Sequence, residues 1–151
     1  MMTIKGLIEK IEKEGNYYLG KHRGYLYIIR RPQEYWWLCW YVLVPKTNKL
    51  YWKHYDEIDW IEIHWWLTFS WKWGIWSFKI TDQYWILWFD AAHSNDVYLL
   101  KVGNHYEVFW DIIEWTYKDM EYMKQECKKL INQIIKYDLK FKKNRRWTKR
   151  K

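Results

Sequence analysis

Four residues that can bind a metal ion or move a proton lie in or just after two apolar runs of this chain. Asp90, His93 and Asp96 are spaced three apart after a strand-like segment, and His64 lies in an earlier one. Imidazole and carboxylate ligands together suit zinc, manganese or iron, and a strand end followed by a loop often presents them. The pattern predicts a metal site with His64, Asp90 and His93 as ligands, where Asp56 or Asp96 would be the general base.

Neighbouring polar residues extend this predicted pocket. Tyr55-Asp56-Glu57 is a dense polar cluster that can supply another carboxylate, and Thr68 lies on the same strand face as His64. We therefore expect a shared pocket in the 55–96 surface, and any cofactor in it would be a divalent metal ion. The residues expected to contact a ligand are Tyr55, His64, Thr68, Asp90 and His93.

A purely structural role for the same residues stays open. Asp90 and Asp96 can accept hydrogen bonds from turn amides, while His64 and His93 can be hydrogen-bonded without binding any ligand. The Tyr55-Asp56-Glu57 run can equally be a solvated loop. The chain has no His-Glu-x-x-His motif, no paired Cys-x-x-Cys, no Walker loop and no nucleophile elbow. The spacing alone therefore names no reaction.

The segments that would position this cluster have the pattern of one antiparallel sheet between two helices. Alternating, aromatic-rich and β-branched runs predict strands at 17–19, 25–30, 35–44, 58–70, 74–81, 83–90 and 97–102. Apolar residues at helical spacing predict a helix from Thr3 to near Gly15, and a longer one that begins near Thr116 and ends near Asp138. The predicted fold class is α+β: a single domain with a mainly antiparallel sheet, an N-terminal helix and a long C-terminal helix packed on it.

Charge divides the chain into a neutral body and a basic end. Lys and Arg number 26 against 18 Asp and Glu, which gives a net charge of +8. Residues 140–151 hold eight of these bases and no acid, so the remaining 18 bases balance the 18 acids. We expect a domain at 1–139 and a basic, disordered tail at 140–151, which either solubilises the protein or binds nucleic acid in a salt-dependent way.

The same composition bears on the cellular compartment. Cys39 and Cys127 lie far apart in sequence without metal-finger spacing, which indicates free thiols in a reducing environment. The longest uncharged apolar run, 35–44, is too short to cross a bilayer as a helix. We therefore expect a cytoplasmic protein that has no membrane partner.

Tryptophan is abnormally frequent and glycine is scarce, with fifteen Trp against six Gly. Several Trp stand where turns or close-packed strands usually need Gly, which supplies backbone conformations that Trp disfavours. One hypothesis is that UGA codons for Gly were translated as Trp. The alternative is a protein that buries many aromatic rings. The positions concerned are Trp40, Trp52, Trp65, Trp66, Trp71 and Trp88.

Several blocks of the chain resemble an uncharacterised family of small bacterial and bacteriophage proteins. The blocks are Cys39-Trp40-Tyr41-Val42, Tyr51-Trp52-Lys53, His64-Trp65-Trp66-Leu67-Thr68 and Trp88-Phe89-Asp90-Ala91-Ala92-His93. The family's patterns are Cys-Gly-Tyr-Val, Tyr-Gly-Lys, His-Gly-Gly-Leu-Thr and Gly-Phe-Asp-Cys-Ala-His-x-Gly-Asp. This chain has Trp at five of the family's Gly positions, as the codon hypothesis predicts. The resemblance implies a shared cluster of His64, Asp90, His93 and Asp96, and a phage or mobile-element origin, but no activity.

Three functions follow as expectations. The first is an accessory protein that binds a small ligand or a host protein through the 55–96 surface. The second is a metal-dependent hydrolase, resembling a phosphoesterase, that uses the His and Asp cluster. The third is nucleic-acid binding through the basic tail.

Overall fold

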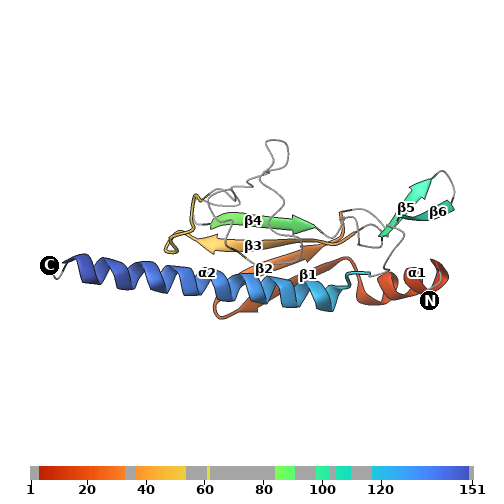
Figure 1. The fold of residues 1–151 in the computed structure, drawn as a ribbon. Helices are drawn as coiled ribbons and strands as arrows, with labels where there is room; N and C mark the ends of the chain where they lie inside the picture. Colours follow the sequence, from red (N-terminus) through yellow and green to blue (C-terminus); the bar gives the residue numbers. More distant parts are fainter. Residues whose placement is uncertain are drawn as a thin grey trace.

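The computed structural model describes residues 4–32, 37–53, 61, 84–90, 98–102, 105–109 and 117–149. In this part of the chain, a four-stranded antiparallel sheet lies against a long C-terminal helix (Figure 1). The elements are α1 (Ile4–Glu14), β1 (Tyr17–His22), β2 (Tyr25–Arg30), β3 (Cys39–Pro45), β4 (Tyr84–Asp90), β5 (Tyr98–Val102), β6 (His105–Phe109) and α2 (Met120–Lys149). The predicted α+β class, with a helix packed on an antiparallel sheet, is confirmed.

The strands of the main sheet follow one another in the order β1-β2-β3-β4. Arg23 and Gly24 connect β1 to β2 with φ angles of 49° and 86°. Positive φ at both central residues is the geometry of a type I′ turn, which matches the twist of a hairpin. In β3 and β4, Cys39 is paired with Asp90 and Pro45 with Tyr84. β5 and β6 form a separate hairpin, and β6 was not predicted from the sequence.

The core lies between the main sheet and α2. Side chains alternate across a strand, and the buried Trp40, Val42 and Val44 of β3 belong to the same apolar cluster as the buried face of α2. That helical face consists of Met120, Met123, Cys127, Leu130, Ile131 and Ile134. Cys39 and Cys127 are both buried free thiols, and burial raises the pKa of Cys127, so this cysteine behaves as a small hydrophobic residue.

Glycine ends the first helix as predicted, because Gly15 has a φ of +80° and its N–H donates to the Ile11 carbonyl at 3.1 Å.

The second helix differs from the prediction at both ends. It begins at Met120, after Asp119, whose Oδ1 accepts from the Tyr122 N–H at 2.8 Å. This is an N-cap bond.

The prediction that α2 ends near Asp138 is wrong, because the helix continues to Lys149 and its C-terminal end projects past the strands (Figure 1). Two local features explain the extension. Residues 139–149 contain neither Gly nor Pro, so no residue in them terminates a helix. Asp138 and Lys142 also form an ion pair one turn apart, at 2.8 Å. Most of the basic end expected to be a disordered tail is therefore helical.

Three predicted features of the sequence cannot be compared with the fold. The strand expected at 74–81 lies outside the described residues, as do Thr116 and, apart from the buried Ile61, the strand expected at 58–70. The remaining predicted strands agree with the structure within a few residues, with β1 extended to His22 and β3 beginning at Cys39.

The Asp119 cap makes stability depend on pH. Partial burial raises the pKa of Asp119, but the Tyr122 N–H and the Lys10 ammonium together lower it below 3.8. Ionised Asp119 therefore stabilises the fold above pH 3.8, and this contribution is lost as the pH falls through the lower folded-state pKa. Asp119→Asn keeps an N-cap oxygen but does not titrate. At neutral pH we expect it to lower the free energy of unfolding by up to about 1 kcal/mol, with the deficit shrinking in acid. Urea unfolding at several pH values measures this, and a deficit that grows in acid would contradict it.

Trp52 occupies a backbone conformation that favours glycine. Its φ is +71°, and its side chain is 59% exposed against the rings of Tyr51 and Trp85. The left-handed region costs an L residue about 1–2 kcal/mol. By contrast, Trp40 is fully buried in the core. Trp65, Trp66 and Trp71 lie outside the described residues.

Two substitutions at Trp52 separate the stability cost of its backbone conformation from the contribution of its ring. Trp52→Gly and Trp52→Ala remove the same aromatic contacts, but only Gly adopts this φ without strain. The Gly variant should therefore be more stable than the Ala variant by about 1 kcal/mol in urea unfolding. Equal stabilities would mean that the backbone relaxes, and would remove the structural support for a glycine codon at position 52. The nucleotide sequence then decides whether that codon is UGA.

Candidate functional site

Most of the residues predicted to form a site lie outside the described part of the chain: Tyr55, Asp56, His64, Thr68, His93 and Asp96. Asp90 is the last residue of β4, and its backbone is opposite Cys39 of β3. Within the described residues, no group of three His, Cys, Asp or Glu side chains is arranged to hold a metal ion. The predicted pocket therefore stays a prediction.

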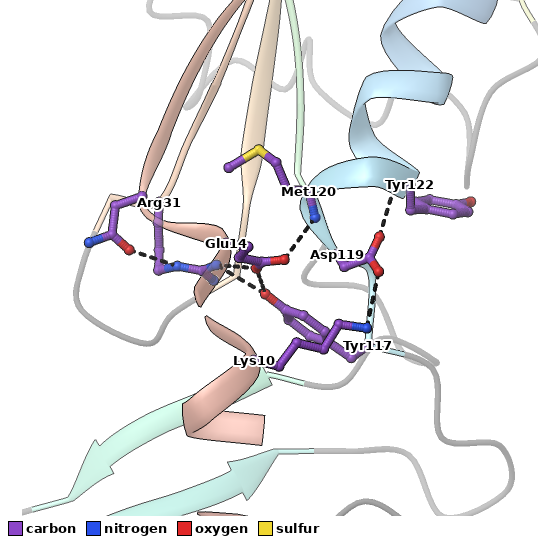
Figure 2. Close-up of polar contacts among 8 residues, drawn as sticks. Lys10, Glu14, Arg31, Tyr117, Asp119, Met120 and Tyr122 are labelled. Carbon is purple, nitrogen blue, oxygen red and sulfur yellow. Dashed lines mark hydrogen bonds and ion pairs between the residues drawn. The ribbon is translucent and has the colours of Figure 1, made fainter. Parts of the chain in front are cut away.

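A buried polar cluster joins α1, β2 and the start of α2 (Figure 2). The Arg31 side chain is 0% exposed, and its Nη2 lies 2.6 Å from Glu14 Oε1 and donates to the Tyr117 hydroxyl at 3.0 Å. The Tyr117 hydroxyl donates to the same Glu14 oxygen. Glu14 Oε2 accepts from the Met120 N–H at 3.1 Å, and Arg31 Nε donates to Asn16 Oδ1 at 3.1 Å. We call this the Arg31 cluster.

The geometry of the Arg31 cluster indicates a structural role. The Glu14 carboxylate accepts three hydrogen bonds, which compensate much of the cost of burying an ion pair. Burial raises the pKa of Tyr117, although the charge of Arg31 acts in the opposite direction, so the phenol stays a hydrogen-bond donor. Because the charges are enclosed by protein groups, we assign the cluster to holding the two helices against the sheet.

A groove of about 900 Å³ runs along the outer side of α2. The described residues that line it all belong to this helix. They are Gln125, Lys128, Lys129, Asn132, Gln133, Lys136, Tyr137, Lys140, Phe141 and Asn144. Four of these residues are lysines, four carry side-chain amides, two are aromatic, and none is acidic. We call this surface the α2 groove. Its chemistry suits a polyanion, because it combines cations, neutral hydrogen-bond donors and aromatic rings.

Two contacts fix loops of the sheet against this helix. Asn132 Oδ1 lies 2.9 Å from His22 Nε2 and accepts from Arg23 Nη1 at 3.1 Å. The β1–β2 turn is thereby held beside the middle of the groove, and the guanidinium of Arg23 adds a cation there. Neither contact was predicted, since the residues lie 110 and 109 positions apart in sequence.

The second contact lies near the far end of the groove. Asp138 is buried, and its Oδ1 accepts from the Lys49 N–H at 3.0 Å, while its Oδ2 pairs with Lys142. The hydrogen bond that Lys142 donates to Asp138 raises the pKa of Lys142, which therefore remains a cation. Lys49 Nζ lies 5.5 Å from the centre of the Phe141 ring, within the range of a cation–π contact. Asp138, the acid that the described structure places at this end of the groove, is thus occupied by the fold.

The sequence does contain a signal for the α2 groove. The lysines at 128, 129, 136 and 140 recur at helical spacing beside the buried stripe of α2. The prediction places the functional charge at 140–151 only, whereas the groove begins at Gln125, six residues after the Asp119 cap of the helix.

Comparison of the chain with models of known families, with curated proteins and with solved structures finds no match. The resemblance to small bacterial and bacteriophage proteins therefore stays a prediction. Within the described ranges, neither helix is long and apolar enough to cross a bilayer.

Proposed function

We propose that the protein binds nucleic acid through α2. The observation that carries this proposal is the α2 groove, where four lysines, four amides and two aromatic residues lie together without an acid among the described lining residues. Over its full length, α2 carries ten basic residues and three acidic ones. A basic surface concentrated on one element of an otherwise neutral protein is the electrostatic pattern of a nucleic-acid-binding protein.

The lysines would supply most of the binding affinity, and the amides would fix the position of the bound strand. Each lysine that neutralises a phosphate releases a condensed counterion, so affinity should fall steeply as salt is added. Side-chain amides of Gln and Asn commonly donate to phosphate oxygens and fix the register of the bound strand. Asn132 is already oriented by the β1–β2 turn, through the contacts of its Oδ1 with His22 and Arg23.

The other expected functions rest on residues outside the described part. Binding of a small ligand or host protein through the 55–96 surface, and metal-dependent hydrolysis by the His and Asp cluster, both stay predictions. A cytoplasmic location also stays a proposal, and the two buried free thiols support it.

Neutralising the α2 groove tests the proposed function. The triple variant Lys129→Gln, Lys136→Gln, Lys140→Gln removes three exposed cations and lowers the net charge from +8 to +5. We expect its affinity for a fluorescein-labelled 20-nucleotide strand to fall at least about tenfold at 50 mM salt. The slope of log affinity against log salt should become shallower by about 2, since each single-strand phosphate contact contributes about 0.7. Fluorescence anisotropy measures both.

A control with the same net charge distinguishes a defined surface from general attraction. Lys5→Gln, Lys13→Gln and Arg30→Gln together also lower the charge to +5, but these exposed residues lie on α1 and β2. The affinity of this control for the labelled strand should fall less than about threefold, because screening at this salt limits the influence of distant charges. Equal losses in the two triple variants, or a groove variant that binds as well as the unaltered protein, would refute the proposed function.

A further inference from the structure

We propose that the α2 groove binds a single strand and that one of its bases stacks on Phe141. This inference rests on the proposed function and specifies its substrate. The Phe141 side chain is 42% exposed and lines the groove between Lys140 and Asn144. A large apolar ring that stays accessible to solvent amid cations is not explained by the core, because the apolar cluster of α2 ends near Tyr137.

The ring favours an unpaired base over a duplex. Bases in a duplex stack on one another, and they offer a protein only their edges in the grooves. An unpaired base has a free face, and stacking on an aromatic side chain is the common device of proteins that bind single strands without regard to sequence. Lys49 Nζ lies over one face of the ring, 5.5 Å from its centre, so a base would stack on the opposite face with a cation close by.

The shape of the surface favours the same substrate. The groove has a volume of about 900 Å³ and follows α2 from Gln125 to Asn144, which leaves room for a few nucleotides of an extended strand. A duplex would instead have to accept α2 in its own major groove, about 12 Å wide, and would offer Phe141 no free base face. The lysines from Lys129 to Lys140 extend over roughly 16 Å of helix, at 1.5 Å per residue. This arrangement can follow the phosphates of an extended strand while the ring holds one base.

The test compares Phe141→Leu with Phe141→Trp in the full-length protein. Leucine keeps an apolar helix-forming residue but has no ring, whereas tryptophan keeps an aromatic face. The probes are a labelled 12-nucleotide thymidine strand, an abasic strand of the same length, and a 12-base-pair duplex. For the unaltered protein, we expect the thymidine strand to bind more tightly than the other two probes. Phe141→Leu should weaken binding of this strand by roughly five- to a hundredfold.

Three further results are required by stacking. Phe141→Leu should leave the salt slope unchanged, since no phosphate contact is removed. It should also leave duplex affinity unchanged, and Phe141→Trp should retain strand affinity. The abasic strand keeps the phosphates without the bases, so it tests stacking in the unaltered protein with no risk of misfolding.

The outcomes separate this inference from the proposed function. If the abasic strand binds as tightly as the thymidine strand, or the duplex binds more tightly than both, or Phe141→Leu loses nothing, the stacking inference is overturned. The proposed function still stands in these cases if the groove triple variant loses affinity and its control does not. If the groove triple variant also binds normally, both proposals fall.

Discussion

Glu14→Gln should lower the free energy of unfolding by about 3–5 kcal/mol, because it leaves the fully buried guanidinium of Arg31 without its counter-charge. The substitution preserves the size of the side chain, so a packing defect contributes little. Glutamine can still accept from the Met120 N–H, which keeps the first turn of α2 connected to α1. The loss therefore measures the burial of an unpaired charge. Urea unfolding followed by circular dichroism gives the free energy.

The same substitution one and a half turns earlier is the control. Glu9 pairs with Lys5 at 4.0 Å, and their side chains are 64% and 88% exposed. Glu9→Gln should therefore cost less than about 0.5 kcal/mol, as exposed ion pairs do. The double variant Glu14→Gln, Arg31→Met should recover part of the loss, because it removes both buried charges. If Glu14→Gln and Glu9→Gln cost the same, the Arg31 cluster contributes no joint between α1, β2 and α2.

The parts of the fold that the sequence predicts are those set by a local period. The apolar residues of α1 repeat every three or four positions, the Gly15 N–H bonds a carbonyl four residues earlier, and the alternation of β2, β3 and β4 is equally local. Burial of one face then follows, because a sheet with an apolar side needs a cover. This is why the α+β arrangement could be predicted while its details could not.

What the sequence does not predict depends on contacts between distant residues or on the absence of a signal. Arg31 meets Glu14 across 17 positions and Tyr117 across 86, and no local pattern specifies that meeting. α2 passes Asp138 because nothing stops it, whereas the prediction ended the helix where the charge run begins. The sequence predicts a candidate site among histidines and aspartates at 55–96, whereas the described structure gathers lysines and amides beside the buried stripe of α2. In the sequence alone, those residues have the pattern of an ordinary solvated face.

A helix that covers the core with one side and presents lysines on another has two requirements that can be separated. Its buried side must be apolar to hold the sheet, while its exposed side is free to carry charge, because surface charges on a helix cost little. Variants of the groove should therefore change affinity without changing stability, and variants of the buried side should do the reverse. Two leucines, one before and one after Asp138 in the sequence, test whether the two sides of the helix act independently.

Leu130→Ala should lower the free energy of unfolding by about 2–5 kcal/mol, the range for removing a buried leucine and leaving a cavity. The Leu130 side chain is 0% exposed and belongs to the cluster that joins α2 to the sheet. Leu139→Ala is the matched control on the same helix. Its side chain is 59% exposed, and it directly follows the buried Asp138. Alanine is the better helix former, so this variant should lie within about 0.5 kcal/mol of the unaltered protein.

The pair of variants locates the point at which α2 leaves the domain. If Leu130→Ala lowers the free energy of unfolding strongly and Leu139→Ala does not, that point lies between the two residues, where Asp138 is bonded to Lys49 and Lys142. A comparable loss in both would show that the helix is packed beyond Asp138, and Phe141 would then be part of the core and not an accessible ring. The stacking of a base on Phe141 therefore requires that Leu139 contributes little to stability.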